Sequence, residues 1–285
     1  MLRRLKVMFH YLSADAAARR SQFDRAIDRL SDVIALDPGN PAAYHDRGVA
    51  QQGLGNYRGS LDDFDKAIAL SPRMARAYSS RGISWKLLGD FDRAIADQTQ
   101  AVALSPWFAE AYSELGVAYL CKPDFYNAVH CLTEAIHHAP KNAGNVKQRG
   151  IALYCRGDFK AAIPDLQRAF DTTNDIYALL FLHLARANSR ENASAALEID
   201  AVKVRSWAWP SAVVGLFLGR LSAEETIAAA GTPDERAEAQ FYLGQQHLLR
   251  GDHAEARKAL EAATQTCPPW FNEHLAAVAD LQRLG

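Results

Sequence analysis

Three features are scarce in this 285-residue sequence: long apolar runs, an excess of charge of one sign, and paired cysteines. No stretch approaches the roughly 20 consecutive apolar residues that a membrane-spanning helix needs. The 32 basic residues against 33 acidic ones leave a net charge of −1, which disfavours nucleic acid as a partner, because phosphate backbones are bound by a surplus of Lys and Arg. The four cysteines have no paired spacing, which is typical of a reducing compartment.

Motifs for catalysis are also missing. The sequence has no Gly-rich phosphate loop, no H-E-x-x-H and no G-x-S-x-G. The best metal candidate is His130, Glu134 and His138 on one helical face, but the outer two lie about 12 Å apart along a helix. Ligands of one ion all lie within about 2 Å of it. We therefore expect a solvated helix face, and we predict no catalytic residue, no cofactor, no metal site and no enzymatic activity.

What the sequence does contain is a repeat of 34 residues. The recurring positions are Pro38, Pro72, Pro106 and Pro140, then Gly48, Gly82, Gly116 and Gly150, and also Tyr44, Tyr78 and Tyr112. Several positional series in one register indicate a repeated structural unit.

Each repeat predicts two helices joined by a tight turn. Small and apolar residues recur at helical spacing between Pro41 and Leu54, and a second helix follows the turn at 55–57 and runs to about Leu70. Glycine readily supplies the left-handed residue that ends a helix, and Asn or Asp caps the next one. A mid-helix glycine such as Gly48 costs about 1 kcal/mol relative to Ala, so its recurrence predicts a close approach of two helices.

The aromatic residue, the glycine, small residues such as Ala94 and the closing proline together resemble the tetratricopeptide repeat (TPR) family. The resemblance covers residues 7–173, with a degenerate first unit that lacks the glycines, and a further unit fits at 237–268. It implies an all-α fold, a superhelical solenoid of helix-turn-helix units with an irregular helical middle segment and a C-terminal unit plus capping helix.

The repeats also contain a covarying pair. The residue before the repeated glycine and the residue sixteen positions later are Arg47 with Asp63, Arg81 with Asp97, Leu115 with Cys131, and Arg149 with Asp165. Arg always accompanies Asp, and Leu accompanies an apolar residue, as Leu243 with Ala259 does in the C-terminal unit. We infer that the two positions face each other between the helices of a unit, as an architectural pair.

After residue 174 the repeat register is lost. Residues 175–187 are apolar nearly all round, which predicts a buried helix. The chain therefore divides into an array of about five units (1–174), a non-repeat helical segment (175–231) and a C-terminal unit with its capping helix (232–285). Residues 176–285 resemble NlpI-type bacterial TPR lipoproteins, through Trp207 and Trp209 and the stretches 216–222, 241–244 and 271–274. That resemblance implies a homodimeric envelope adaptor that brings hydrolases to a protease.

In the TPR arrangement the first helix of each unit lines a concave groove. The residues predicted to bind a partner there are His45, Val49, Gln52, Arg76, Ser79, Ile83, Lys86, Glu110, Val117, Lys147, Gln148, Ile151 and Tyr154. An apolar stripe with mixed-charge flanks suits a peptide or an amphipathic helix, and equally it can merely pack neighbouring helices. Ser79 and Ile83 stand where chaperone-binding TPR proteins have the Lys and Asn of their carboxylate clamp, so capture of a free C-terminus is disfavoured.

The sequence thus predicts a non-enzymatic scaffold or adaptor that binds another protein, with no transmembrane segment. The alternative is a self-association module, built on a basic N-terminal region in which seven Lys and Arg residues outnumber three Asp residues within positions 1–30. Such a patch can touch an anionic surface or simply be a solvated face. The chain as given slightly favours the cytoplasm, and the periplasm or envelope if a leader has been removed.

Overall fold

The computed structural model describes residues 2–204 and 208–285, where all regular secondary structure is helical and no strand occurs. Its contacts divide the chain into two compact units, Met1–Ala118 and Tyr119–Gly285. This division falls inside the repeat array, whereas the sequence placed the first boundary at 174. The helices after residue 175 pack on those within residues 143–173 and share a core with them, and the division at 174 and 231 stays a prediction.

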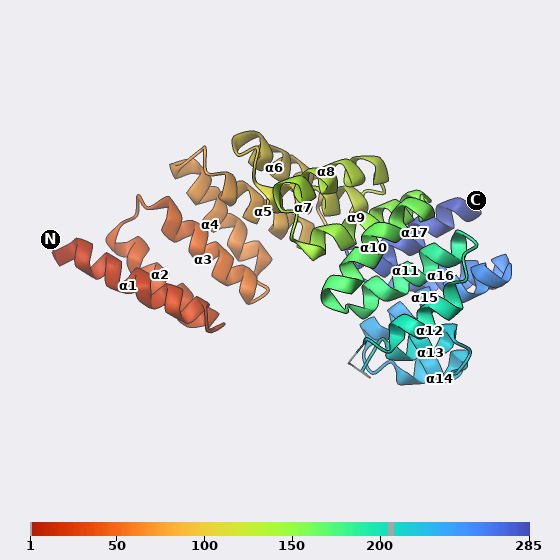
Figure 1. Ribbon diagram of the computed structural model, residues 1–285. Coiled ribbons are helices and arrows are strands. Elements are labelled where there is room, and N and C mark those ends of the chain that lie inside the picture. The colour runs from red at the N-terminus through yellow and green to blue at the C-terminus, as the bar shows by residue number, and fades with distance from the viewer. Residues whose placement is uncertain (1, 205–207) are drawn as a thin grey trace. The chain divides into compact units, whose positions relative to one another are not determined.

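The first unit consists of helices that follow each other as antiparallel pairs (Figure 1). They are α1 (Leu2–Ala18), α2 (Phe23–Leu36), α3 (Pro41–Gly53), α4 (Tyr57–Leu70), α5 (Ala75–Leu87), α6 (Phe91–Leu104) and α7 (Ala109–Cys121), the last of which crosses the boundary. Each helix packs against its chain neighbour, α1 on α2, α3 on α4 and α5 on α6. The predicted helix-turn-helix units are therefore present.

The turns between paired helices follow the capping chemistry expected from the sequence. Gly55 and Gly89 adopt left-handed backbone angles, with φ of 75° and 83°, which a residue with a Cβ rarely adopts. The side chain of Asn56 then accepts a hydrogen bond from the backbone N–H of Gly59, and that of Asp90 from Arg93. Each turn thus ends one helix and caps the next within two residues.

The mid-helix glycines lie where two paired helices come closest, as predicted. A Cβ at Gly48 would stand 2.7 Å from the ring of Phe64, and one at Gly150 would stand 2.7 Å from Leu166. Gly244 in the C-terminal repeat has the same relation to Leu260, at 2.8 Å. Each contacted residue follows its glycine by sixteen positions, so the interhelical contact repeats with the sequence.

Where an arginine precedes the repeated glycine, it forms a bidentate pair with the aspartate sixteen positions later. The Nε and Nη2 atoms of Arg81 donate to Asp97 at 2.8 and 2.7 Å. The equivalent bonds measure 2.9 and 2.7 Å for Arg47 with Asp63, and 2.6 and 2.8 Å for Arg149 with Asp165. Both oxygens of each carboxylate are thereby bound by one planar guanidinium, the strongest geometry for such a pair.

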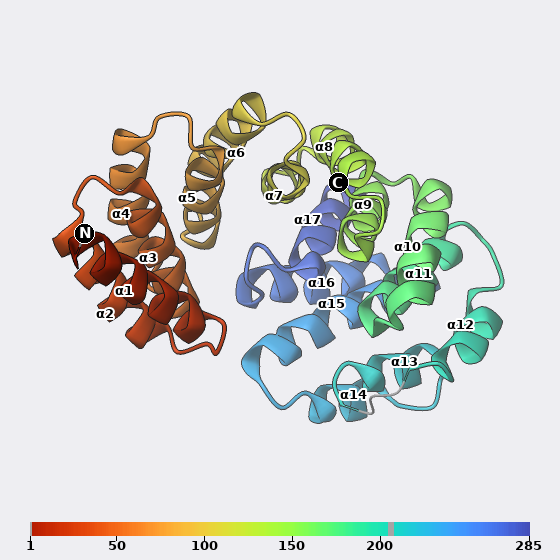
Figure 2. The same ribbon diagram turned by 60° about the vertical axis from the view of Figure 1, so that its left-hand side comes forward.

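In the second unit the last helices of the chain pack back on its first ones (Figure 2). Its helices are α8 (Phe125–His138), α9 (Ala143–Arg156), α10 (Phe159–Thr173), α11 (Ile176–Asn188), α12 (Ala193–Ala201), α13 (Ser211–Phe217), α14 (Ala223–Ala229), α15 (Pro233–Arg250), α16 (His253–Thr266) and α17 (Asn272–Leu284). Helix α11 is the core: residues 178–185 are all buried, most of them completely, which confirms the helix that is apolar on every side.

The C-terminal helix α17 packs on α15 and α16, as a capping helix does, but it also packs on α9. The hydroxyl of Tyr154 on α9 donates to Gln245 on α15 at 2.8 Å, and Arg283 on α17 donates to the backbone oxygen of Cys155 at 2.7 Å. The C-terminal repeat therefore covers the inner side of α9, where the sequence predicted an open groove.

Replacing Gly150 with Ala should destabilise the fold by about 1–2 kcal/mol, because the clash with the buried Leu166 outweighs the gain in helix propensity. Gly39→Ala is the matched control, since nothing lies closer than 4.0 Å to its added Cβ, and it should change stability by less than about 0.5 kcal/mol. Urea unfolding followed by circular dichroism measures both. Equal effects of the two substitutions would contradict the close approach.

A double-mutant cycle on Arg149 and Asp165 should give a coupling free energy of about 1–3 kcal/mol, because the Asp165 carboxylate is nearly buried and truncating one partner leaves the other uncompensated. The exposed pair of Arg19 with Asp15 serves as the control. Its coupling should stay below about 0.5 kcal/mol. Unfolding measurements on the single and double Ala variants supply the cycle, and a coupling no larger than the control would rule out an architectural role.

Candidate functional site

The first unit has a line of apolar side chains that are not fully covered. Val49 on α3 is 41% exposed, and Ile83 on α5 and Val117 on α7 are partly exposed. The three occupy the same repeat position on the first helix of successive pairs. Because these helices stack side by side about 10 Å apart, the apolar groups form a strip with one member per helix.

Several polar side chains predicted to face a partner instead bind the next helix of the array. The Gln52 amide donates to the backbone oxygen of Ser80 and the hydroxyl of Ser84, both at 2.7 Å. Lys86 donates to Glu114 at 2.5 Å, and the His45 ring lies 3.2 Å from the hydroxyl of Ser80. These residues join successive helices, which is the packing role that the sequence left open, and binding by the other residues of the face stays a prediction.

The remaining predicted groove residues of the first unit differ in exposure. Arg76 and Glu110 are exposed and supply one charge of each sign beside the apolar strip. Ser79 is buried, at 3% exposure, and its backbone oxygen accepts from the Gln98 amide. Of the predicted groove residues in this unit, Val49, Arg76 and Glu110 are therefore exposed, and Ile83 and Val117 are partly exposed.

In the second unit the predicted groove residues are occupied by the protein itself. Ile151 and Tyr154 are completely buried, since α15 and α17 pack over α9, and a partner cannot reach them as a groove lining. Lys147 donates to Asp175 at 2.6 Å, and Gln148 is partly buried. The groove prediction therefore does not extend to Ile151 and Tyr154, because sequence comparison between repeats does not show a later segment folding back.

The second unit also buries a cluster of two glutamates. One oxygen of Glu238 accepts from the indole N–H of Trp209 at 2.8 Å and from the hydroxyl of Tyr177 at 3.0 Å. Glu273 accepts from the hydroxyl of Tyr242 at 2.8 Å. The two carboxyl groups are only 6% and 3% exposed. The sequence contains no clear signal for this cluster, because Glu273 stands between Asn272 and His274 and Glu238 follows Asp234 and Glu235 closely.

Burial raises the pKa of Glu273 to about 7, and the neighbouring Glu238 carboxyl adds to the effect. Burial also raises the pKa of Glu238, which the hydrogen bonds from Trp209 and Tyr177 oppose. Near neutral pH the cluster therefore exchanges a proton, because two buried carboxylates resist being charged together.

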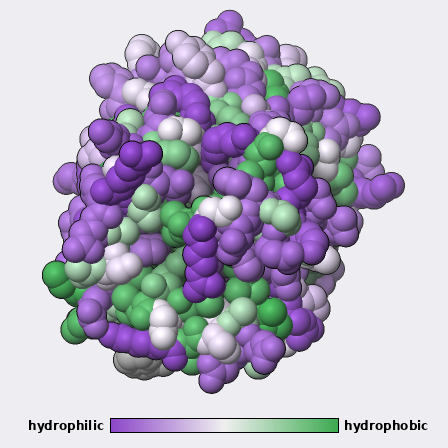
Figure 3. Space-filling view, turned by 90° about the vertical axis from the view of Figure 1, so that its right-hand side faces the viewer, coloured by the Kyte–Doolittle hydropathy of each residue, from purple (hydrophilic) through white to green (hydrophobic). Residues whose placement is uncertain are grey.

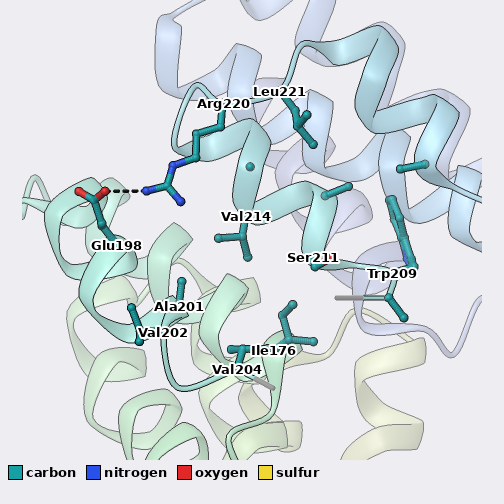
Figure 4. A pocket seen from close by; sticks show the side chains of 14 residues that line it. Ile176, Glu198, Ala201, Val202, Val204, Trp209, Ser211, Val214, Arg220 and Leu221 are labelled. Atoms are coloured by element: carbon teal, nitrogen blue, oxygen red, sulfur yellow. Dashed lines mark hydrogen bonds and ion pairs between the residues drawn. The ribbon is translucent and has the colours of Figure 1, made fainter. Parts of the chain in front are cut away.

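A pocket of about 700 Å³ lies beside this cluster, between the start of α11, helix α12 and helix α13 (Figure 4). Its walls are apolar, and the side chains of Ile176, Ala201 and Val214 line it together with Trp209. Arg220 and Glu198 pair across one side at 2.6 Å. Trp207, which the sequence grouped with Trp209, lies outside the described residues.

The surface around the pocket is unusually apolar. Val202 is 85% exposed and Ile199 is 69% exposed, both on or next to α12. The space-filling view shows apolar side chains gathered in the lower part of this face, at the height of α12 to α14 in Figure 1 (Figure 3). These residues were not predicted as a site, because a single apolar residue at a helix end gives no periodic signal.

Metal sites, membrane-spanning helices and reactive cysteines are the remaining features to consider. Within residues 2–204 and 208–285, no group of three or more His, Cys, Asp or Glu side chains is arranged to hold a metal ion. No helix in this part of the chain is both long and apolar enough to cross a membrane. Cys131, Cys155 and Cys267 are buried free thiols, and burial raises the pKa of Cys131 to about 11, so these thiols are not poised as nucleophiles.

Comparison with known proteins identifies tetratricopeptide repeats at residues 15–81 and 220–269. No curated protein matches the sequence significantly. The structure is similar to that of pilF from Pseudomonas aeruginosa, with a TM-score of 0.62 and 15% identity over 72% of this chain and 96% of that chain. The chain thus carries TPR repeats, and the predicted all-α TPR fold is confirmed.

Two further solved structures share the fold. MamA (41-end) from Desulfovibrio magneticus RS-1 has a TM-score of 0.54 and 21% identity, over 59% of this chain and 96% of that chain. YrrB, described as a TPR protein with an unusual peptide-binding site, has a TM-score of 0.56 and 16% identity, over 67% of this chain and 98% of that chain. TPR proteins mediate protein–protein interactions and are generally non-enzymatic scaffolds.

The buried acid Glu273 should make stability depend on pH. Its pKa is about 7 in the folded chain and about 4.3 in an unfolded one. The folded state therefore holds a proton that the unfolded state loses, and the contribution is full below about pH 4 and disappears as pH rises through 7. The difference in unfolding free energy between wild type and Glu273→Gln (wild type minus variant) should fall by at most about 1.4 kcal/mol per pH unit as pH rises from about 5 to 7.

The exposed Glu191→Gln variant is the control for this titration. Its difference from wild type should stay flat across the same pH range. A flat difference for Glu273→Gln as well would mean that the buried carboxyl does not carry the proton.

Proposed function

We propose that this TPR chain is a non-enzymatic scaffold that binds a peptide or amphipathic helix of a partner protein on the face formed by α3, α5 and α7. The observation that carries this function is the strip of Val49, Ile83 and Val117, one apolar side chain on each of three successive helices. Val49 is 41% exposed, although it stands in the middle of a stacked array, where apolar side chains are normally covered.

The spacing of the strip defines the ligand. Stacked helices about 10 Å apart match apolar side chains at positions i and i+7 of a helix, whose rise is about 1.5 Å per residue. They also match positions i and i+3 of a peptide in the polyproline II conformation, which has three residues per turn and a rise of about 3.1 Å per residue. The exposed Arg76 and Glu110 favour a ligand with one charge of each sign beside its apolar residues.

The polar side chains of the face support a ligand that is bound mainly by apolar contact. Gln52 and Lys86 are held by Ser84 and Glu114, so they would have to exchange an existing bond for one to the ligand. Ser79 is buried and Ile83 is apolar, so neither of these two positions supplies a side chain to pair with a terminal carboxylate. An internal segment of a partner therefore fits better than a free C-terminus.

The resemblance of residues 176–285 to NlpI-type lipoproteins makes an envelope-associated bacterial adaptor for hydrolases or proteases the specific expectation for this scaffold. A second candidate function is self-association. It is favoured by one observation in the first unit, an exposed apolar side of α1 that carries Phe9 at 67% and Leu12 at 63% exposure.

A peptide selected from a displayed random-peptide library against the whole chain should bind the Val49→Glu variant at least tenfold more weakly than wild type, equivalent to about 1.4 kcal/mol. The introduced carboxylate would be desolvated by the ligand without a partner. Fluorescence polarisation with the labelled peptide measures the two dissociation constants.

Val202→Glu is the matched control, since it places the same substitution at an 85% exposed valine of the second unit. It should leave the peptide affinity unchanged. If Val202→Glu weakens binding and Val49→Glu does not, the α12–α13 pocket is the binding surface and the α3–α5–α7 face is not.

A further inference from the structure

The N-terminal helix α1 exposes a row of large apolar side chains. Leu5 is 50% exposed, Met8 55%, Phe9 67% and Leu12 63%. Their spacing of three, one and three residues places all four on one side of the helix, within an arc of about 100°. Nowhere else in the described chain do four large apolar residues of one helix lie this exposed.

This row points away from the body of the first unit. The opposite side of α1 carries Ala14 and Ala17, at 2% and 7% exposure, which pack toward α2, and Tyr11, whose hydroxyl bonds to Asp46 on α3. None of the described residues covers this row. The apolar row is thus the surface that another helix would cover.

We propose that a second copy of this chain covers it, by antiparallel pairing of α1 with α1 about a two-fold axis between Met8 and Phe9. An isologous contact requires a surface that is complementary to itself. The row meets this requirement because its positions are symmetric about that midpoint. Antiparallel pairing brings Leu5 opposite Leu12 of the other copy and Met8 opposite Phe9, so each apolar side chain meets an apolar one.

The charged residues beside the row also favour antiparallel pairing. Arg4 and Asp15 are both exposed and lie eleven residues apart, which is about three turns, so they share one flank of the row. In an antiparallel pair each flank faces the same flank of its partner. Asp15 then lies opposite residue 2 of the other copy, and residue 2 is only about 3 Å along the helix axis from Arg4. Asp15 of each copy can therefore pair with Arg4 of the other, which gives two symmetric ion pairs.

A parallel pair would place these charges badly. The flank with Arg4 would face the opposite flank of the second copy, which carries Lys6 at nearly the same height, so two cations would meet. Asp15 already accepts from Arg19 of its own helix at 2.9 Å, but a carboxylate has lone pairs for a further donor. Charge complementarity therefore favours the antiparallel pair.

An anionic membrane is the other occupant that a basic amphipathic helix can have. The row is narrow, with four side chains, whereas a helix lying in a lipid surface buries a wide apolar face. The pairing of α1 with itself gives a specific surface to the self-association candidate and rests on that candidate, not on peptide binding. Four side chains per copy bury less than the roughly 800 Å² per partner of a stable complex, so the dimer is expected to be weak.

Sedimentation equilibrium of the whole chain between about 5 and 200 μM, a range suited to weak complexes, should show a monomer–dimer equilibrium. Phe9→Glu should weaken the dimer at least tenfold, because it places two carboxylates at the two-fold axis. Circular dichroism checks that this exposed substitution leaves the fold intact, and the affinity of the selected peptide should not change.

Charge reversal tests the register. Arg4→Glu and Asp15→Arg should each weaken the dimer, and the double variant should restore it, because the exchanged charges meet again across the two copies. The two residues are about 16 Å apart within one helix, so rescue cannot arise within a single chain. Likewise, the double variant Leu5→Cys and Leu12→Cys should give an oxidised dimer that neither single variant gives.

Three results would contradict the pairing. A dimer that is unaffected by Phe9→Glu would mean that the copies associate through another surface, so that self-association stands and the α1 contact fails. A chain that stays monomeric at 200 μM would rule out both self-association and the α1 contact. If the monomeric chain instead binds vesicles containing phosphatidylserine and Phe9→Glu abolishes that binding, the row is a membrane contact.

Discussion

In three of the repeats one guanidinium group holds three helices together, and the stacking of those repeats depends on it. The Nε and Nη2 atoms of Arg81 bind Asp97 in its own pair, and the Nη1 atom binds Asp65 in the preceding second helix at 2.5 Å. Arg47 reaches Ser31 in the same way, at 3.0 Å, and Arg149 reaches Thr133 at 3.4 Å. Because the donors of a guanidinium are fixed in one plane, each contact specifies how a pair sits on its predecessor.

The glycine that follows each arginine makes this reach possible. It brings the paired helices close enough for Phe64 or Leu166 to lie where a Cβ would be, and the Arg–Asp bond closes the adjacent position. The C-terminal repeat keeps the glycine contact, Gly244 with Leu260, but has no arginine there. Its stacking uses buried hydrogen bonds of Tyr154, Gln245 and Asp280 instead, and burial raises the pKa of the Asp280 carboxyl. Arg–Asp pairs therefore stabilise the stacking of the earlier repeats, and buried hydrogen bonds stabilise the packing of the C-terminal repeat.

The fold could be predicted from the sequence because the same local features recur in several repeats. The turn at 55–57, the glycine Gly48 and the partner of Arg47 each recur with fixed spacing, so local chemistry and register agree. The second unit was harder because its decisive contacts are long-range and occur once. Nothing in the neighbourhood of Ile151 signals that α17 will cover it. The buried Glu238 and the pocket around Val214 likewise depend on segments far apart in the chain.

The candidate sites lie where side chains of the repeats are not covered by contacts with neighbouring helices. On the α3–α5–α7 face several polar groups already bind one another, as Gln52 does with Ser84, while Val49 and the charged Arg76 and Glu110 remain exposed. A ligand there gains mostly from apolar burial, which depends on spacing and size more than on a particular sequence. Helix α1 differs, because an apolar row flanked by opposite charges in fixed register demands one specific complement. The proposed peptide site would therefore recognise a class of segments, and the proposed α1 contact a single surface.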